Sequence, residues 1–213
     1  MYRFHGDLAE GTVIDRPNRF IVNVVGPSGI VYCHLHDPGR LEELIYPGNR
    51  VLIRETVGVK TDHSITAALN NSRWIITDTR IHSEIASKFL PPDAQREVKL
   101  GRKRLDFKSG EYYIEVKGCT LMISGKAMFP DAPTKRGREH MDLLAQLAEN
   151  GQGAVVLILV MRDDVTCFAP NWRTDPEFTE AFERAMKAGV ERRILTFSLS
   201  GNRVIFRGEI GMC

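Results

Sequence analysis

The stretch that most constrains the fold of this chain is residues 102–117, read as Arg-Lys-Arg-Leu-Asp-Phe-Lys-Ser-Gly-Glu-Tyr-Tyr-Ile-Glu-Val-Lys. Residues alternate in character on both sides of Ser109-Gly110, which is a turn signal, and the second half is rich in strand-prone Tyr, Ile and Val. The pattern predicts a β-hairpin. With Ser109-Gly110 at the turn, Asp106 opposes Tyr113 and Arg104 opposes Glu115.

The hairpin should have two chemically different faces, because side chains alternate across a strand. Leu105, Phe107, Ile114 and Val116 share a face that can enter a core. The opposite face carries Arg104, Asp106, Tyr113, Glu115 and Lys117. In this register Asp106 and Glu115 are diagonal neighbours, roughly 7–8 Å apart at the backbone.

Two carboxylates at that separation can share one Mg²⁺ or Mn²⁺, since hard divalent cations prefer oxygen ligands and Mg²⁺ keeps several waters. Lys117 lies on the same face and could steady an attacking water or the charge on a phosphate. An Asp followed across a hairpin by Glu-x-Lys resembles the PD-(D/E)XK nuclease signature. A solvated hairpin whose charges pair across strands, for tenths of a kcal/mol, is the alternative.

Composition narrows the class of protein. The 213 residues are 43% hydrophobic and 26% charged, which is typical of one large or two modest globular domains. The net charge of +2 means that affinity for a polyanion must come from local clusters of cations. The scattered Cys33, Cys119, Cys167 and Cys213 lack a Cys-x-x-Cys pair, so we expect reduced thiols and no structural zinc.

No segment of the sequence looks like a leader or a membrane span. The N-terminus has no apolar signal region, and the longest apolar run, residues 154–161, is too short to cross a bilayer. We expect a cytoplasmic protein.

The first 78 residues show the pattern of a small β-barrel. Short strands are predicted at residues 11–15, 19–25, 30–35 and 50–57, with one helical turn at residues 40–44. This order indicates a barrel of the OB type, a fold whose open face often binds nucleic acid.

Two local clusters in this region suggest other chemistry. His34 and His36 would share one strand face while Cys33 points to the other, so we favour packed or hydrogen-bonded histidines over a metal site. Residues 60–64 hold Asp, His and Ser, but contiguous residues on an extended loop rarely satisfy the spatial roles of a catalytic triad.

Residues 79–213 alternate between helices and strands. We predict helices at residues 81–90, 135–150 and 176–189, with Thr134 as an N-cap and a capping box at residues 174–177. Strands are predicted at residues 96–100, in the central hairpin, at residues 154–160 and in a closing hairpin at residues 194–199 and 204–207. The order indicates an α+β or α/β domain with a mixed sheet, which accommodates a PD-(D/E)XK core.

Cations gather at two places in this region. Five Lys or Arg lie within residues 96–104 against the single acid Glu97, which suggests a surface that follows phosphates. Lys135, Arg136 and Arg138 fill the first turn of a predicted helix, where an anion could dock on free backbone N–H groups. A solvated loop at residues 101–103, and pairing of the helix cations with Glu139 and Asp142, remain alternatives.

Several motifs together closely resemble the sugar fermentation stimulation protein A (SfsA) family over nearly the whole chain. They are Arg19-Phe20, Pro38-Gly39-Arg40-Leu41, Pro47-Gly48, Asn70, Thr79-Arg80, Glu97-Val98-Lys99, Arg104-x-Asp106-Phe107, Glu115-Val116-Lys117-x-x-Thr120-Leu121, Phe129-Pro130-Asp131-Ala132-x-Thr134-x-Arg136-Gly137 and Gly189-Val190.

The resemblance implies an OB-type domain over residues 1–78 and a PD-(D/E)XK-like domain over residues 79–213, in a DNA-binding protein linked to sugar utilisation. It implies Asp106 and Glu115 as ligands of Mg²⁺ or Mn²⁺, Lys117 as a catalytic residue and Glu97 as a further acid. Asp131, in a Pro-Asp pair that no Glu-x-Lys follows at hairpin distance, is a second-tier candidate from the residues themselves. Residues expected to bind nucleic acid are Arg40, Arg102, Lys103, Arg104, Lys135, Arg136 and Arg138.

Two functions remain open at this point. One is a Mg²⁺-dependent DNA endonuclease, and the other is a DNA-binding regulator of sugar-utilisation genes that keeps a nuclease architecture without turnover. An RNA or nucleotide-derived substrate is a weaker third. The expected partner is DNA, as a duplex and without sequence specificity, and a homodimer is left open.

Overall fold

The computed structural model describes residues 1–56 and 61–213. Val57, the last residue of a predicted strand, and Lys60, the first residue of the 60–64 cluster, lie outside the described residues. The described chain forms two compact units. The first comprises Met1–Ile81, Met161–Asp163 and Phe197–Arg207, and the second comprises His82–Val160, Asp164–Thr196 and Gly208–Cys213.

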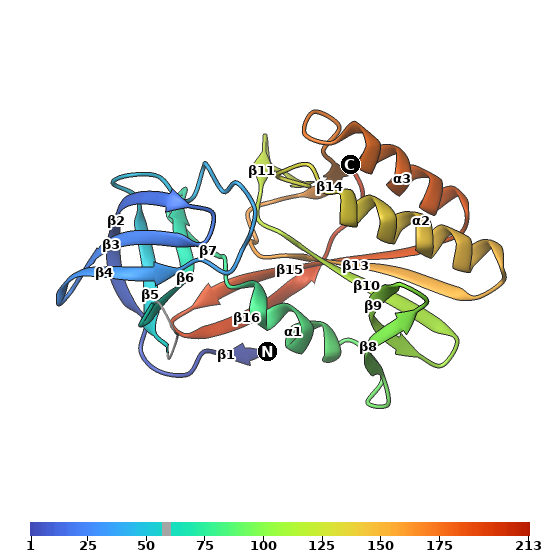
Figure 1. Ribbon diagram of the computed structural model, residues 1–213, viewed down its shortest axis with the longest axis horizontal. Coiled ribbons are helices and arrows are strands. Elements are labelled where there is room, and N and C mark those ends of the chain that lie inside the picture. The colour runs from blue at the N-terminus through green and yellow to red at the C-terminus, as the bar shows by residue number, and fades with distance from the viewer. Residues whose placement is uncertain (57–60) are drawn as a thin grey trace. The chain divides into compact units, whose positions relative to one another are not determined.

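A closed five-stranded barrel forms most of the first unit (Figure 1). Its strands are β2 (Ala9–Asn18), β3 (Ile21–Gly26), β4 (Gly29–His34), β5 (Arg50–Glu55) and β6 (His63–Asn70). Neighbours pair antiparallel in the order β4-β3-β2-β5-β6, and a short parallel pairing of β4 with β6 closes the ring. β7 (Arg73–Ile76) pairs antiparallel with the second half of β6. The predicted OB-type barrel is confirmed.

Alternation of apolar residues explains the barrel interior. Val22, Val24 and Cys33 are fully buried on β3 and β4, whereas the residues between them are partly or well exposed. The predicted helical turn lies between β4 and β5, where the amide of Ile45 donates to the carbonyl of Leu41 at 2.8 Å. Its Leu41 is fully buried in the same cluster, so the turn packs against the barrel core.

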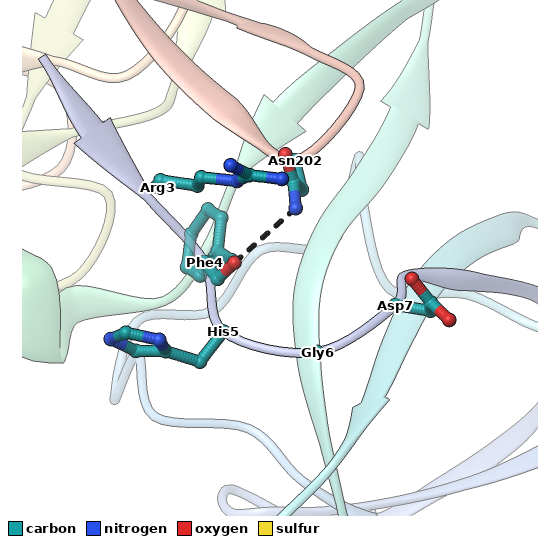
Figure 2. Close-up of a pocket in the computed structure, with 6 residues that line it drawn as sticks. All are labelled: Arg3, Phe4, His5, Gly6, Asp7 and Asn202. Atoms are coloured by element: carbon teal, nitrogen blue, oxygen red, sulfur yellow. Dashed lines mark hydrogen bonds between the residues drawn. The ribbon is translucent and has the colours of Figure 1, made fainter.

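The first unit also ties the N-terminal residues to the end of the chain. β1 (Tyr2–Arg3) pairs with β16 (Arg203–Glu209), and Phe4 exchanges backbone and side-chain hydrogen bonds with Asn202 (Figure 2). A pocket of about 390 Å³ lies here, lined by Arg3, Phe4, His5, Gly6, Asp7 and Asn202.

The second unit is built on a mixed sheet, as predicted. β8 (Gln95–Leu100), β9 (Lys103–Ser109) and β10 (Tyr112–Cys119) pair antiparallel. β10, β13 (Gly153–Val160) and the first part of β15 (Glu191–Ser200) then run parallel. β13 lies between two parallel neighbours and is buried along most of its length, which accounts for its continuous apolar sequence.

Two helices lie side by side and pack against this sheet (Figure 1). They are α2 (Lys135–Glu149) and α3 (Pro176–Lys187). Met141, Leu144, Phe178 and Phe182 belong to the same buried cluster as the residues on one face of β13. The predicted N-cap is confirmed, since Thr134 Oγ1 accepts from the amide of Gly137 at 3.0 Å.

Two helix ends differ from prediction. The N-cap of α3 is Asp175 rather than Thr174, because the Asp175 carboxylate accepts from the amide of Phe178 at 2.9 Å and Pro176 occupies the first helical position. The helix predicted at residues 81–90 is shorter: a 3₁₀ turn (Thr79–Ile81) leads into α1 (His82–Ser87).

A three-stranded sheet that we did not predict joins β11 (Met122–Ile123), β12 (Lys126–Phe129) and β14 (Cys167–Pro170). Cys167 forms a disulfide with Cys213, with their Cα atoms 5.0 Å apart. The expectation of reduced thiols is therefore wrong for this pair, whose proximity depends on tertiary contacts. Cys33 and Cys119 are free and buried. In the described part of the chain, no helix is long and apolar enough to cross a membrane.

Candidate functional site

The central hairpin forms, but its turn lies one residue later than predicted. Ser109 pairs with Tyr112, and Phe107 pairs with Ile114, which leaves Gly110-Glu111 as the two-residue loop. Gly110 has a φ of +55°, the left-handed conformation that such a tight loop requires. The prediction that Asp106 opposes Tyr113 is therefore wrong, because Tyr113 pairs with Lys108.

Moving the turn by one residue changes the pairing partner of every hairpin residue by two positions, which is an even number. An odd shift would have moved one strand's side chains to the other face, whereas an even shift preserves the faces. An extension of the observed pairing by one position would bring Asp106 opposite Glu115, two residues away from the predicted partner Tyr113.

Glu115 is the buried centre of the site. Its side chain is 3% exposed, and its Oε1 accepts from Lys117 Nζ at 2.5 Å and from His140 Nδ1. Its other oxygen, Oε2, is buried and has no hydrogen-bond partner among the described residues. Burial alone would raise the pKa of Glu115, but the His140 hydrogen bond and the Lys117 charge outweigh it and leave the pKa below its usual value.

Asp106 supplies the second carboxylate. Its Oδ2 accepts from the backbone amide of Val116 at 2.7 Å, so it reaches across to the strand that carries Glu115. Burial, and then the charge of Glu115, raise the pKa of Asp106. The two carboxylates thus lie close enough for the charge of Glu115 to disfavour the ionised form of Asp106.

The Asp106–Val116 contact also explains a departure from the predicted faces. Regular pairing of β9 with β10 stops at Phe107–Ile114, one residue before Asp106. Leu105 and Tyr113, which we predicted on opposite faces, belong to the same buried cluster. The Asp106 carboxylate accepts from the Val116 amide, which would otherwise donate within the β9–β10 ladder, and the strict alternation of side chains ends at this point.

His140 positions Glu115 and was not predicted in this role. It lies on α2, is 4% exposed, and its Nε2 accepts from Arg136 Nε at 3.5 Å. Because Nε2 is an acceptor there, Nδ1 carries the proton that it donates to Glu115. The sequence places Arg136 and His140 one helical turn apart, but only the packing of α2 on β10 brings them to Glu115.

His82 is a second histidine that sequence reasoning missed. A Cβ added to Gly118 would lie 2.1 Å from the His82 ring, so α1 approaches the backbone of β10 directly after Lys117. Gly118 and Lys117 are consecutive on the strand and point to opposite faces. His82 therefore lies on the sheet face opposite the acid pair.

The remaining acids of the predicted site have different environments. Glu97 has a φ of +56° and an exposed side chain that pairs with Arg104 at 2.9 Å. Its charge contributes to raising the pKa of Asp106, after burial and Glu115. Asp131 follows β12, and its Oδ2 is buried without a partner among the described residues. Asp106, Glu115 and Lys117 are thus the predicted residues that the structure brings together.

The predicted nucleic-acid-binding cations are partly engaged within the protein. Lys103 Nζ donates to the carbonyl of Glu139 at 3.0 Å. Arg138 pairs with Glu177 of α3 rather than with Glu139 or Asp142, because α3 packs beside α2. Arg102 and Lys135 are exposed. Arg40 is exposed in the first unit, where its carbonyl accepts from Arg16.

The histidines of the barrel are packed and hydrogen-bonded, as favoured from the sequence. The rings of His34 and His36 lie 4.2 Å apart, and His36 Nε2 is 3.1 Å from Ser64 Oγ. Cys33 points into the core, where burial raises the pKa of its thiol to about 12. A joint metal site of these residues is therefore incompatible with their orientation.

The described residues hold no group of three or more His, Cys, Asp or Glu side chains arranged to bind a metal. A cation at the hairpin would have two protein carboxylates, those of Asp106 and Glu115. Mg²⁺ commonly binds through one or two carboxylates and keeps waters in its other positions, so two are enough.

Comparison with known proteins identifies the family. A family model described as the SfsA N-terminal OB domain matches residues 14–77, and one described as the sugar fermentation stimulation protein RE domain matches residues 72–203. The sugar fermentation stimulation protein homolog of Saccharolobus solfataricus is 53% identical over 213 residues, covering 100% of this chain and 89% of the relative. The homolog of Thermoplasma acidophilum is 49% identical over 211 residues, covering 99% of this chain and 95% of the relative.

A solved structure is similar over its full length. It is described as "The structure of Pyrococcus Furiosus SfsA in complex with Ca2+" and superposes with a TM-score of 0.90 at 29% sequence identity, covering 100% of this chain and 98% of that one. On the matched domains and these full-length relatives, the chain belongs to the sugar fermentation stimulation protein family, SfsA.

Proposed function

We propose that this protein binds DNA and hydrolyses its phosphodiester bonds with the help of a divalent cation at Asp106 and Glu115. The observation that carries the proposal is the state of Glu115. One of its oxygens is held by Lys117 and His140, while the other is buried without a hydrogen-bond partner among the described residues, and the charge of Glu115 acts on a second carboxylate, that of Asp106. Buried polar atoms are rarely left unpaired, so the free oxygen of Glu115 is a suitable ligand for a cation.

A hard divalent cation fits the donors present. Asp106 and Glu115 would hold it, both through oxygen, and Mg²⁺ or Mn²⁺ is the expected ion. When bound, such a cation supplies Lewis acidity and a water of lowered pKa. The description of the Pyrococcus furiosus SfsA structure as a complex with Ca²⁺ supports a divalent cation in this family.

The other residues act on charge and orientation. Lys117 keeps an ammonium group beside Glu115 and would stabilise negative charge that grows on the phosphate oxygens. His140, oriented by Arg136, holds the Glu115 carboxylate in place and is a positioning residue. Glu97 and Asp131 stay candidates for further acids near the site.

The order of elements around the hairpin supports the same chemistry. Helix α1, strands β8 to β10, the short strands β11 and β12, helix α2 and strand β13 follow one another along the chain, an order that accommodates a PD-(D/E)XK core with Asp106 on β9 and Glu115-x-Lys117 on β10. The exposed cations Arg102 and Lys135 are available to phosphates. A binding protein without turnover is disfavoured, because two carboxylates facing a phosphate backbone would weaken binding unless a cation separates them.

Conversion of supercoiled plasmid to nicked or linear DNA tests the proposal. With Mg²⁺ or Mn²⁺ present, the wild type should cut, and Asp106→Asn or Glu115→Gln should lower the rate about 100-fold or more. EDTA should abolish cutting. Asp142→Asn is the matched control, since Asp142 is a half-exposed acid on α2 that pairs with Arg184, and it should cut at the wild-type rate.

Cutting by Asp106→Asn at the wild-type rate would refute this site. Plasmid that is retarded in a gel but never cut, with either cation, would refute hydrolysis. It would instead support the DNA-binding regulator.

A further inference from the structure

The outer face of β3 and β4 in the barrel exposes an unusual amount of apolar and aromatic surface. Tyr32 is 59% exposed, Ile30 65%, and Phe20, in the turn before β3, 45%. Across the strand pair, Tyr32 lies opposite Asn23 and Ile30 opposite Val25, which is 48% exposed. Surface residues of this size are ordinary singly, but a contiguous group marks an interaction surface.

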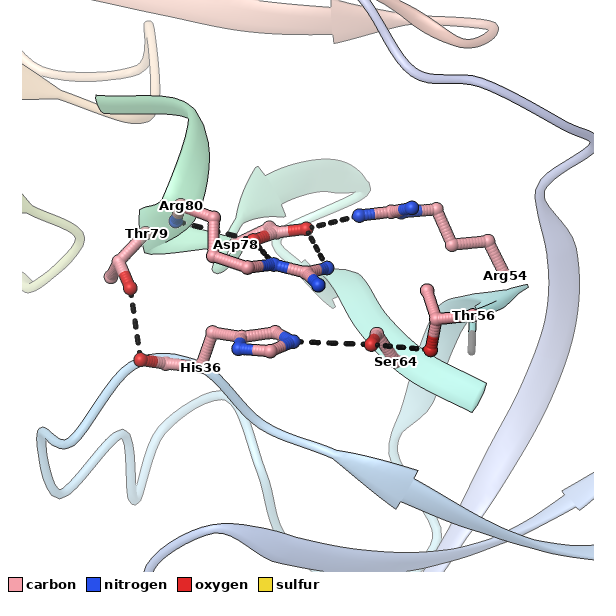
Figure 3. Close-up of polar contacts among 7 residues, drawn as sticks. All are labelled: His36, Arg54, Thr56, Ser64, Asp78, Thr79 and Arg80. Carbon is pink, nitrogen blue, oxygen red and sulfur yellow. Dashed lines mark hydrogen bonds and ion pairs between the residues drawn. The ribbon is translucent and has the colours of Figure 1, made fainter. Parts of the chain in front are cut away.

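Three rings of this face form a stack. Phe20 and His34 lie 6.1 Å apart with an angle of 23° between their planes, and His34 lies 4.2 Å from His36. His36 is fixed at its far edge, because its Nε2 is hydrogen-bonded to Ser64 Oγ, which lies 2.9 Å from Thr56 Oγ1 (Figure 3). The ring of His36 is therefore held in one orientation by these hydrogen bonds.

Arg16 holds the turn that carries Phe20. Its guanidinium donates to the carbonyl of Arg19 at 2.9 Å and to the carbonyl of Gly39 at 2.8 Å. Those carbonyls belong to the β2–β3 turn and to the segment after β4, so one side chain fastens Phe20 beside the histidines. The polar network serves to present the ring stack, whose outer members remain accessible to solvent.

Positive charge borders the rings. Asp78 is fully buried and accepts from both Arg54 and Arg80, with the closest contact of each at 2.8 Å (Figure 3). Two guanidinium groups against one carboxylate leave one net positive charge, and the Arg80 side chain is 41% exposed. Arg80 and Arg54 both act electrostatically on His36, which places this charge beside the stack. Arg19 and Arg40 add exposed cations next to Phe20.

We propose that the ring surface, defined as Phe20, Tyr32, His34 and His36, binds single-stranded DNA by stacking on unpaired bases, with Arg80 and Arg19 meeting the phosphates. β3 and β4 are the second and third strands of the barrel, the face on which OB folds bind oligonucleotides. Rings stack on any base, so the expected binding is sequence-tolerant. The inference rests on the proposed function in taking DNA as the ligand.

The geometry favours unpaired bases over the duplex expected from the sequence. In a duplex, each base is stacked between its neighbours and its faces are inaccessible to a protein ring. A surface made of exposed rings gains little from a duplex, whereas rows of cations alone would suit one.

Fluorescence anisotropy with a labelled oligo-dT of about 15 nucleotides tests the inference, since an OB fold covers about 4–16 nucleotides. The titration is done in EDTA, so that hydrolysis cannot contribute. The wild type should bind oligo-dT more tightly than a duplex of equal length. The double variant Phe20→Leu with Tyr32→Leu should bind oligo-dT about tenfold or more weakly, because leucine keeps an apolar side chain but has no ring face.

Tyr46→Leu is the matched control. Tyr46 is 46% exposed in the same unit but lies between β4 and β5, outside the ring surface, so its replacement should leave oligo-dT binding unchanged. Circular dichroism of each variant checks that the barrel folds. An unchanged affinity in the folded double variant, or a wild type that binds only duplex or neither DNA, would overturn the inference.

The inference and the proposed function fail separately. Plasmid cutting together with ring-independent DNA binding would leave hydrolysis standing and remove the ring surface. Ring-dependent oligo-dT binding without cutting under any cation would support the ring surface and refute hydrolysis.

Discussion

Residue type alone does not decide what an ionisable side chain does in this protein. Asp78 and Glu115 are buried and Asp106 is partly buried. Two guanidinium groups lower the pKa of Asp78 against the effect of burial, while Glu115 adds to burial in raising the pKa of Asp106. The charge of Asp78 is neutralised by arginine side chains and is structural. The carboxylate of Asp106 is short of positive partners. The latter environment is the one that favours binding a cation.

His36 gives a prediction at the residue scale. Burial, followed by the charge of Arg80, lowers the pKa of His36 from 6.5 to about 4. Asp78 opposes this shift, while His34 and Arg54 add to it. As pH falls from 6.5 towards 4, the unfolded chain takes up a proton at His36 that the folded chain does not, so the free energy of unfolding should decrease in that window.

Urea unfolding at a series of pH values measures the effect. His36→Gln should flatten the dependence between pH 6.5 and 4, because glutamine does not titrate there. His5→Gln, which changes an exposed histidine of the same unit, should keep the wild-type slope. Equal slopes for wild type and His36→Gln would contradict the prediction.

At the scale of elements, the packing of α2 against α3 depends on one shared acid. Asp175 is 4% exposed; its Oδ1 accepts from the amide of Phe178 in α3, and its Oδ2 accepts from the amide of Thr134 at the start of α2, at 2.7 Å. One carboxylate therefore accepts hydrogen bonds from backbone amides at the N-terminal ends of both helices that cover the sheet.

Asp175→Ala should lower the free energy of unfolding by about 2 kcal/mol or more, because each lost cap costs about 1 kcal/mol. Asp175→Asn keeps one acceptor and should lose about half as much. Thr134→Ala, which removes only the cap of α2, should cost about 1 kcal/mol. Chemical denaturation followed by circular dichroism gives these values. A loss in Asp175→Ala no larger than in Thr134→Ala would show that the shared contact is not used.

At the scale of the whole molecule, the Cys167–Cys213 disulfide is the covalent link that the sequence did not reveal. It closes a sequence separation of 46 residues within the second unit. In the chain-entropy description, a loop of that length restricts the unfolded state by about 4 kcal/mol.

Scanning calorimetry with and without reductant tests this contribution. Reductant should lower the melting temperature of the wild type, and Cys213→Ser should melt at that lower temperature under both conditions. The buried Cys33 and Cys119 remain in the variant, so they control for general effects of the reagent. A melting temperature of the wild type that does not respond to reductant would contradict a stabilising disulfide.

The sequence by itself determined the elements and the family. Alternation predicted the barrel and the hairpin, and the apolar run at residues 154–160 predicted a buried central strand; all three depend on local periodicity, which the chain carries without help from tertiary contacts. The same alternation predicted Asp106 and Glu115 as neighbouring acids, although the turn lies one residue later than the local pattern indicated.

Only the tertiary structure decided which distant groups meet. His140 reaches Glu115 across 25 residues, Arg138 pairs with Glu177 on another helix, and Cys167 meets Cys213 through the sheet that we did not predict. Local patterns cannot indicate such contacts, because they depend on how helices and strands pack rather than on the spacing of residues along one element. The same packing leaves one oxygen of Glu115 buried without a hydrogen-bond partner in the described part of the chain, which is the feature on which the proposed chemistry depends.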